Sequence, residues 1–154
     1  METGYIGAPE WIASACTKIQ GQFTSGASSI SQRAAIAAVS ADPSVTFEMR
    51  SAFLSRRELV LAELNKIPGV KTNVPEGAFY VFPDISSFFG KSDGTTVVSN
   101  ADDLSLYILN KVNVALVTGA AFGAPNCIRI SYAASEQELR EALRRISEAL
   151  LALN

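Results

Sequence analysis

Residues 126–133 read NCIRISYA, in which polar and apolar side chains alternate and Arg129 lies between two isoleucines. This alternation predicts a strand that buries one face and leaves the other in water, because successive side chains of a strand point to opposite faces. Arg129 falls on the wet face, where an arginine is usually solvated or paired with a nearby carboxylate. Its planar fork also suits the carboxylate of a ligand. The pattern leaves both interpretations open and favours the structural one.

The elements on either side of this strand predict a small sheet covered by helices. Residues 113–119 (NVALVTG) predict a second strand, joined to the first by the glycine-containing loop 119–125. This loop lacks the glycine spacing of nucleotide-binding loops, so we interpret it as a turn that can approach a ligand closely. Residues 135–153 predict a helix that begins with a capping box, Ser135 and Glu138. Its apolar stripe consists of Leu139, Leu143, Ile146 and Leu150.

The upstream pattern adds a long helix and further short elements. Residues 43–66 predict one amphipathic helix, with Asp42 as its N-cap and Pro43 in its first turn. The next elements predicted are two short strands within 70–84 around a turn at 75–77, a loop at 85–100 and a helix at 100–112. This order indicates helices packed on a small, mostly antiparallel sheet, which is an α+β domain.

The first 42 residues fit that domain poorly and predict the end of another layer. Residues 4–8 (GYIGA) predict a short buried strand that Pro9 ends. Two helices are expected to follow, over about 10–22 and over 29–41, the second capped by Ser28 or Ser29. We therefore predict an α/β chain in which residues 1–42 belong to a different domain from residues 43–154.

Composition excludes several classes of function. Histidine is absent, so the chain holds no Ser-His-Asp triad and no histidine metal site, and we expect no bound metal. Its 13 basic and 15 acidic residues form no basic patch, which argues against nucleic acid as a partner. No apolar run approaches the roughly 18 residues of a membrane helix. Cys16 and Cys127 are isolated in apolar surroundings, which favours reduced core thiols in a cytoplasmic protein.

Five blocks of this sequence, taken in order, resemble the C-terminal part of the class I and II aminotransferases. The blocks are GYIGAPEWI, QFTSGASSISQRAA, PEGAFYVFPD, ALVTGAAFGAPNCIRISYA and the closing amphipathic helix. The resemblance covers essentially the whole length, and within the family it is closest to the bacterial aspartate aminotransferases. It implies a pyridoxal-phosphate enzyme of fold type I, in which residues 43–154 form the small domain and residues 1–42 end the large one.

The resemblance also implies roles for individual residues. Arg129 matches the arginine that binds the substrate α-carboxylate, and Phe79, which follows Gly77, matches an aromatic residue of the substrate pocket. Thr24 and Ser25 match a segment that reaches across a homodimer toward the cofactor phosphate of the partner. The position of Gln20 carries, in one branch of the family, an arginine for the side-chain carboxylate of the substrate. An acidic-substrate preference would therefore depend on residues outside this chain.

The family's Schiff-base lysine precedes the block GYIGAP, whereas the first lysine here is Lys18, within a predicted helix. Because the chemistry needs that amine, we expect this chain alone to bind no pyridoxal phosphate and to catalyse nothing. The parent enzyme would convert aspartate and 2-oxoglutarate into oxaloacetate and glutamate. Two alternatives stay open: a non-enzymatic α+β module for binding or oligomerisation, and another fold-type I enzyme such as an aromatic aminotransferase or a lyase.

Overall fold

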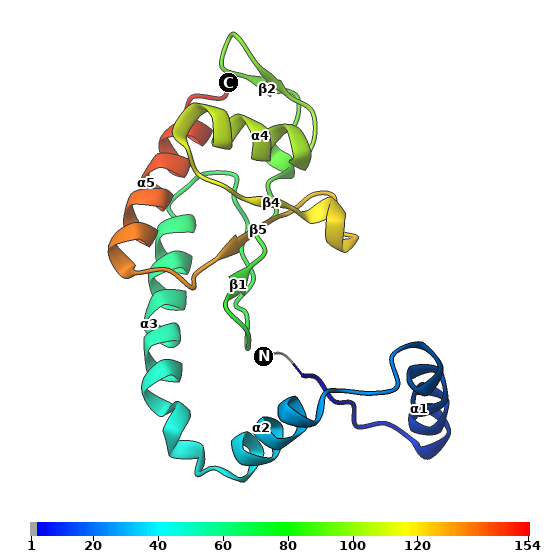
Figure 1. The fold of residues 1–154 in the computed structure, drawn as a ribbon. Helices are drawn as coiled ribbons and strands as arrows, with labels where there is room; N and C mark the ends of the chain where they lie inside the picture. Colours follow the sequence, from blue (N-terminus) through cyan, green and yellow to red (C-terminus); the bar gives the residue numbers. More distant parts are fainter. Residues whose placement is uncertain (1–2) are drawn as a thin grey trace. The chain divides into compact units, whose positions relative to one another are not determined.

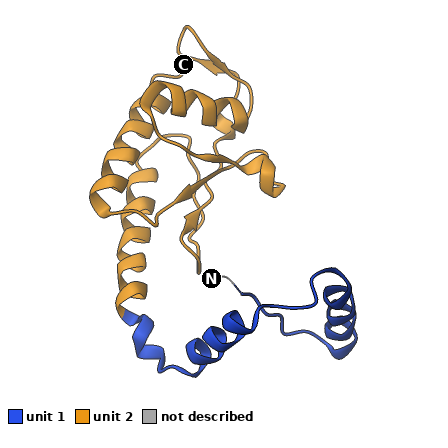
Figure 2. Cartoon of the chain, viewed as in Figure 1, with its two compact units in different colours: residues 1–47 blue, residues 48–154 orange. Residues whose placement is uncertain are grey.

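The computed structural model describes residues 3–154, which form two compact units that divide between Phe47 and Glu48 (Figure 2). The first unit is helical, and both of its predicted helices are confirmed. Ser28 caps the second of them, because its hydroxyl accepts a hydrogen bond from the backbone N–H of Ser31 (3.3 Å). Its elements are α1 (Glu10–Phe23), α2 (Ser29–Ser40) and the 3₁₀ turn η1 (Pro43–Thr46).

The predicted buried strand at residues 4–8 is wrong in this structure. Residues 3–9 have no regular structure, and Tyr5 is 90% exposed. A strand exists only through hydrogen bonds to a neighbouring strand, and the described part of this unit contains none. Cys16 is also exposed rather than part of a core, whereas Cys127 in the second unit is half-buried.

The long predicted helix is formed in two parts. Asp42 caps η1, with its carboxylate 2.8 Å from the backbone N–H of Ser44, and α3 (Phe47–Leu64) follows at once. The helix ends at Leu64, earlier than predicted, and the chain turns back at Gly69, whose φ of +91° suits glycine. Only the C-terminal part of α3 is buried.

The second unit contains a three-stranded antiparallel sheet with the strand order β1-β5-β4. A separate two-stranded hairpin of β2 and β3 lies in the segment 85–100, where the sequence predicted a loop. The predicted strand pair within 70–84 is reduced to β1 and a single bridge between Lys71 and Asp84, because Pro75 and Pro83 cannot donate ladder hydrogen bonds. The strands are β1 (Tyr80–Val81), β2 (Lys91–Ser92), β3 (Val97–Val98), β4 (Val117–Thr118) and β5 (Ile128–Ser131).

Two further helices, α4 (Ala101–Val112) and α5 (Glu136–Leu151), complete this unit, and both confirm their predictions. The capping box of α5 is complete: the Ser135 side chain accepts a hydrogen bond from the backbone N–H of Glu138, and the Glu138 side chain accepts one from the backbone N–H of Ser135. In Figure 1, α5 runs beside α3 and α4, and these helices share one apolar core with the buried face of the sheet. The least exposed members of this core include Val60, Leu64, Val81, Ile85, Leu104, Ile108, Ile128, Ile146 and Leu150.

Candidate functional site

Arg129 lies at the centre of the sheet, on the face that points away from the core. On β5 it alternates with Ile128 and Ile130, which are both buried. Its cross-strand partner on β4 is Val117. On the other side, the pairing of Val81 with Ile130 places Phe82 opposite Arg129. The predicted wet-faced strand is therefore confirmed, and its neighbours on that face are apolar or aromatic.

The guanidinium of Arg129 rests against two aromatic rings. Its central carbon lies 4.4 Å from the ring centre of Tyr80 and 4.5 Å from that of Phe122. Both distances are within the range of a cation–π contact. Within residues 3–154, no hydrogen bond or ion pair uses this guanidinium, so the ordinary carboxylate partner of a surface strand arginine is missing there. Its N–H edges thus remain available to a carboxylate from outside.

Phe79 belongs to the same aromatic cluster. Its ring contacts that of Tyr80 (4.6 Å between centres) and stacks on that of Phe53 from α3 (5.7 Å, 22° between planes). Phe79 is 37% exposed, so one side of the ring is open to a ligand. The structure therefore links the predicted residues Arg129 and Phe79 through Tyr80, which follows Phe79 in the sequence.

Gly77 lies in the turn before this cluster. The positive φ of this turn belongs to Ala78 (+59°) and not to Gly77. The hydroxyl of Tyr132 donates to the carbonyl of Ala78 (3.2 Å) and so helps to hold this conformation. Gly77 and Phe53 line one side of an open cavity of about 310 Å³.

The glycine loop after β4 places Phe122. A Cβ on Gly119 would lie 2.2 Å from the carbonyl oxygen of Ala124 and 2.4 Å from that of Cys127, so only glycine fits. The loop turns through η3 (Gly119–Phe122) and leaves it at Gly123, which has a φ of +73°. This turn brings the Phe122 ring onto the guanidinium of Arg129.

Thr24 and Ser25 are exposed in the turn that ends α1, in the first unit. The Thr24 hydroxyl accepts a hydrogen bond from the side-chain amide of Gln20, and Ser25 adopts a φ of +63°. These two hydroxyls thus lie in a different unit from Arg129.

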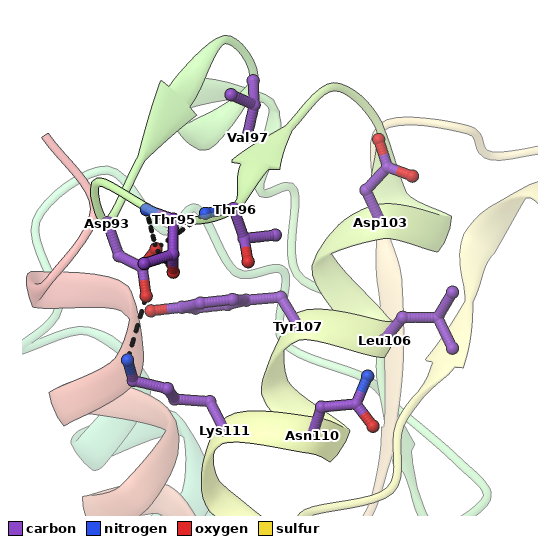
Figure 3. A pocket seen from close by; sticks show the side chains of 9 residues that line it. All are labelled: Asp93, Thr95, Thr96, Val97, Asp103, Leu106, Tyr107, Asn110 and Lys111. Atoms are coloured by element: carbon purple, nitrogen blue, oxygen red, sulfur yellow. Dashed lines mark hydrogen bonds and ion pairs between the residues drawn. The ribbon is translucent and has the colours of Figure 1, made fainter.

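A second polar cluster surrounds a cavity of about 320 Å³ beside α4 (Figure 3). The carboxylate of Asp93 is 5% exposed and accepts hydrogen bonds from Thr95, Thr96 and the ammonium of Lys111 (2.9 Å). Hydrogen bonds from Thr95 and Lys111 hold the pKa of Asp93 well below its usual range. Asp93 lies between β2 and β3 and Lys111 lies on α4, so their ion pair fastens the hairpin to α4.

We expect the Asp93→Asn variant to unfold several degrees below the wild type at pH 7. Because the folded state lowers the pKa of Asp93, its stabilising effect is present above the unfolded pKa of about 4 and is lost as pH falls through the folded value. The difference in Tm should therefore shrink as the pH falls below about 4. Thermal unfolding across this pH range tests the effect, with Glu76→Gln as a control, and an unchanged difference at low pH would contradict it.

The described residues contain no cluster of side chains that could hold a metal ion. No group of three or more metal-ligating Cys, Asp or Glu side chains occurs within residues 3–154. Lys66 and Lys111 each line a cavity and are ion-paired, with Glu63 and Asp93 respectively. None of the helices in residues 3–154 has the length and apolar character that a membrane-spanning helix requires.

Comparison with known proteins places these features in a family. The model of the family described as aminotransferase class I and II matches residues 2–146. A bifunctional aspartate aminotransferase and glutamate/aspartate-prephenate aminotransferase from Petunia hybrida is 47% identical over 97% of this chain and 32% of its own length. An aspartate aminotransferase from Rhizobium meliloti is 42% identical over 95% of this chain and 36% of its own.

Solved structures agree with these relatives. The aspartate aminotransferase of Rhizobium meliloti superposes with a TM-score of 0.83 and 40% identity, over 96% of this chain and 37% of that one. An aromatic aminotransferase from Pyrococcus horikoshii gives a TM-score of 0.75 and 34% identity, over 94% and 37%. The chain thus spans about a third of the length of the relatives that it matches.

Proposed function

Because the chain belongs to the class I and II aminotransferases, we propose that it is the C-terminal part of an aspartate-type aminotransferase in which Arg129 binds the α-carboxylate of the substrate. The observation that carries this proposal is the unpaired guanidinium of Arg129, which lies on two aromatic rings with no carboxylate of residues 3–154 beside it. The parent would exchange the amino group of aspartate with 2-oxoglutarate.

In this proposal Arg129 and Phe79 act on the substrate together. The planar fork of Arg129 fits both oxygens of the α-carboxylate, which fixes the orientation of the amino acid. Phe79 offers an apolar wall next to this anchor, through its contact with Tyr80. Gly77 leaves space in the adjoining turn, since a Cβ there would meet nothing within 4 Å.

Pyridoxal phosphate would supply the electron sink that aminotransferase chemistry requires. The residues of this chain do not fit that group by themselves: no lysine precedes Lys18, and Lys66 and Lys111 are held in ion pairs. We therefore derive no step through the cofactor and propose that the chain alone does not transaminate. In the parent, a cytoplasmic homodimer, Thr24 and Ser25 would approach the partner's cofactor phosphate.

The same proposal assigns residues 1–42 to the end of the large domain and residues 43–154 to the small domain. In support, neither α1 nor α2 buries a residue within the first unit, whereas the second unit has its own apolar core. Large apolar side chains such as Trp11 (74% exposed) would then pack on the rest of the large domain in the parent.

Two assays test the proposal. The 154-residue chain mixed with pyridoxal phosphate should give no aldimine absorbance that aspartate discharges, and such turnover would overturn its assignment as an inactive part.

The full-length parent should transaminate aspartate with 2-oxoglutarate. A parent that accepts only phenylalanine or tyrosine would instead be an aromatic aminotransferase, like the structurally similar protein from Pyrococcus horikoshii.

In the parent enzyme, Arg129→Lys should raise KM for aspartate and for 2-oxoglutarate by about tenfold, with a smaller effect on kcat. Lysine keeps the charge but replaces a two-point fork by a single ammonium. Steady-state kinetics measures the change, and Arg140→Lys, at an exposed position on α5, is the matched control. An unchanged kcat/KM in Arg129→Lys would remove Arg129 from the carboxylate site.

A further inference from the structure

We propose that Tyr80 and Phe122 are positioning residues, which hold the guanidinium of Arg129 in one orientation before the substrate carboxylate arrives. This inference rests on the proposed function of Arg129. The two rings come from elements that flank β5 on its two sides, Tyr80 from β1 and Phe122 from the turn after β4. Each ring centre lies within 4.5 Å of the guanidinium carbon.

Ring contacts suit a carboxylate-binding arginine better than an internal ion pair does. An ion pair would occupy the N–H edges and cancel the charge, whereas aromatic rings contact the face of the guanidinium and leave its edges free. A free arginine side chain samples many rotamers, and part of this rotamer entropy is lost when it binds a ligand. Contacts that already restrict the side chain reduce that cost at the moment of binding.

The rings are themselves held in place. Phe122 packs at 83° against Phe82, with 5.8 Å between the ring centres, and Tyr80 is contacted by Phe79. The turn that carries Phe122 depends on Gly119, as its close approach to the carbonyl oxygens of Ala124 and Cys127 shows. The contacts on Arg129 are thus part of a supported arrangement on an otherwise exposed face of the sheet.

Kinetics of the parent enzyme provide the first test. Tyr80→Leu and Phe122→Leu should each raise KM for the amino acid and the 2-oxo acid about fivefold, with kcat less affected, because they loosen the carboxylate anchor. The conservative variants Tyr80→Phe and Phe122→Tyr keep a ring and should restore the wild-type KM. When combined with Arg129→Lys, the leucine variants should raise KM little further. Fully additive effects on KM would show that the rings act independently of Arg129 and would overturn the proposal.

A second readout needs no activity and separates this inference from the proposed function. In the 154-residue chain, the ¹⁵N relaxation of the Arg129 Nε–Hε group reports its mobility directly. We expect a restricted group in the wild type, and in Tyr80→Leu and Phe122→Leu an order parameter that falls toward the roughly 0.6 of flexible groups. Unchanged mobility in both leucine variants would overturn the positioning role, even if the parent proves to be an aminotransferase. If the Arg129 group is restricted but the parent shows no transaminase activity, the proposed function is contradicted and the positioning role is not.

Discussion

Replacing Gly119 by alanine is expected to lower the free energy of unfolding of the second unit by about 3 kcal/mol. The added Cβ would lie 2.2 Å from the carbonyl oxygen of Ala124 and 2.4 Å from that of Cys127. Both atoms belong to the backbone, so no side-chain rotation can relieve the overlap. The loop must instead give up hydrogen bonds that it now makes, such as the one from Gly119 N–H to the carbonyl of Cys127 (2.7 Å).

Chemical denaturation of the 154-residue chain measures this loss. Gly77→Ala is a matched control, because its Cβ would meet nothing within 4 Å and its φ is not positive, and it should change the stability by less than about 0.5 kcal/mol. If Gly119→Ala proved as stable as this control, the close packing of the loop would be wrong. The variant should also release Phe122 from Arg129, which raises the mobility of the arginine side chain.

Local signals in the sequence account for what could be predicted of the fold. Ser28 and Ser135 each cap a helix through their own side chains, so these two helix starts could be read from a few adjacent residues. Strands could not be placed as well, since four of the five are only two residues long, and β1 pairs with β5, which lies far away in the chain. The segment GYIGA shows the same limit: its pattern suits a strand, but no partner strand for it is present among residues 3–154.

The residues of the candidate site likewise fall into those that the sequence could predict and those that it could not. Arg129 could be found because the alternation around it fixes its face on β5. The role of Phe122 could not, because it lies in a 3₁₀ turn seven residues earlier, whose direction is set by Gly119 and Gly123. For Tyr80 the one signal was its spacing of two from Phe82, which puts both rings on the same face of the strand.

The 154-residue chain is expected to self-associate through the first unit. Trp11, Ile19 and Phe23 form a stripe along α1 and are 74%, 59% and 84% exposed. Trp11 and Phe23 alone leave about 300 Å² of mostly apolar surface in water, comparable to the largest patch on a typical monomer. In the proposed parent, the large domain covers this stripe. When the chain is alone, the stripe of a second copy is the apolar surface most readily available to cover it.

Sedimentation velocity, with hydrophobic-dye fluorescence beside it, tests this expectation. The triple variant Trp11→Gln, Ile19→Gln, Phe23→Gln should sediment as a monomer and bind several-fold less dye, while the unfolding transition of the second unit stays unchanged. The matched control is Val97→Thr, Leu106→Gln, Leu109→Gln, three exposed apolar positions of the second unit, and it should still self-associate. A wild-type chain that is monomeric and dye-free would contradict the expectation that this exposed stripe drives self-association.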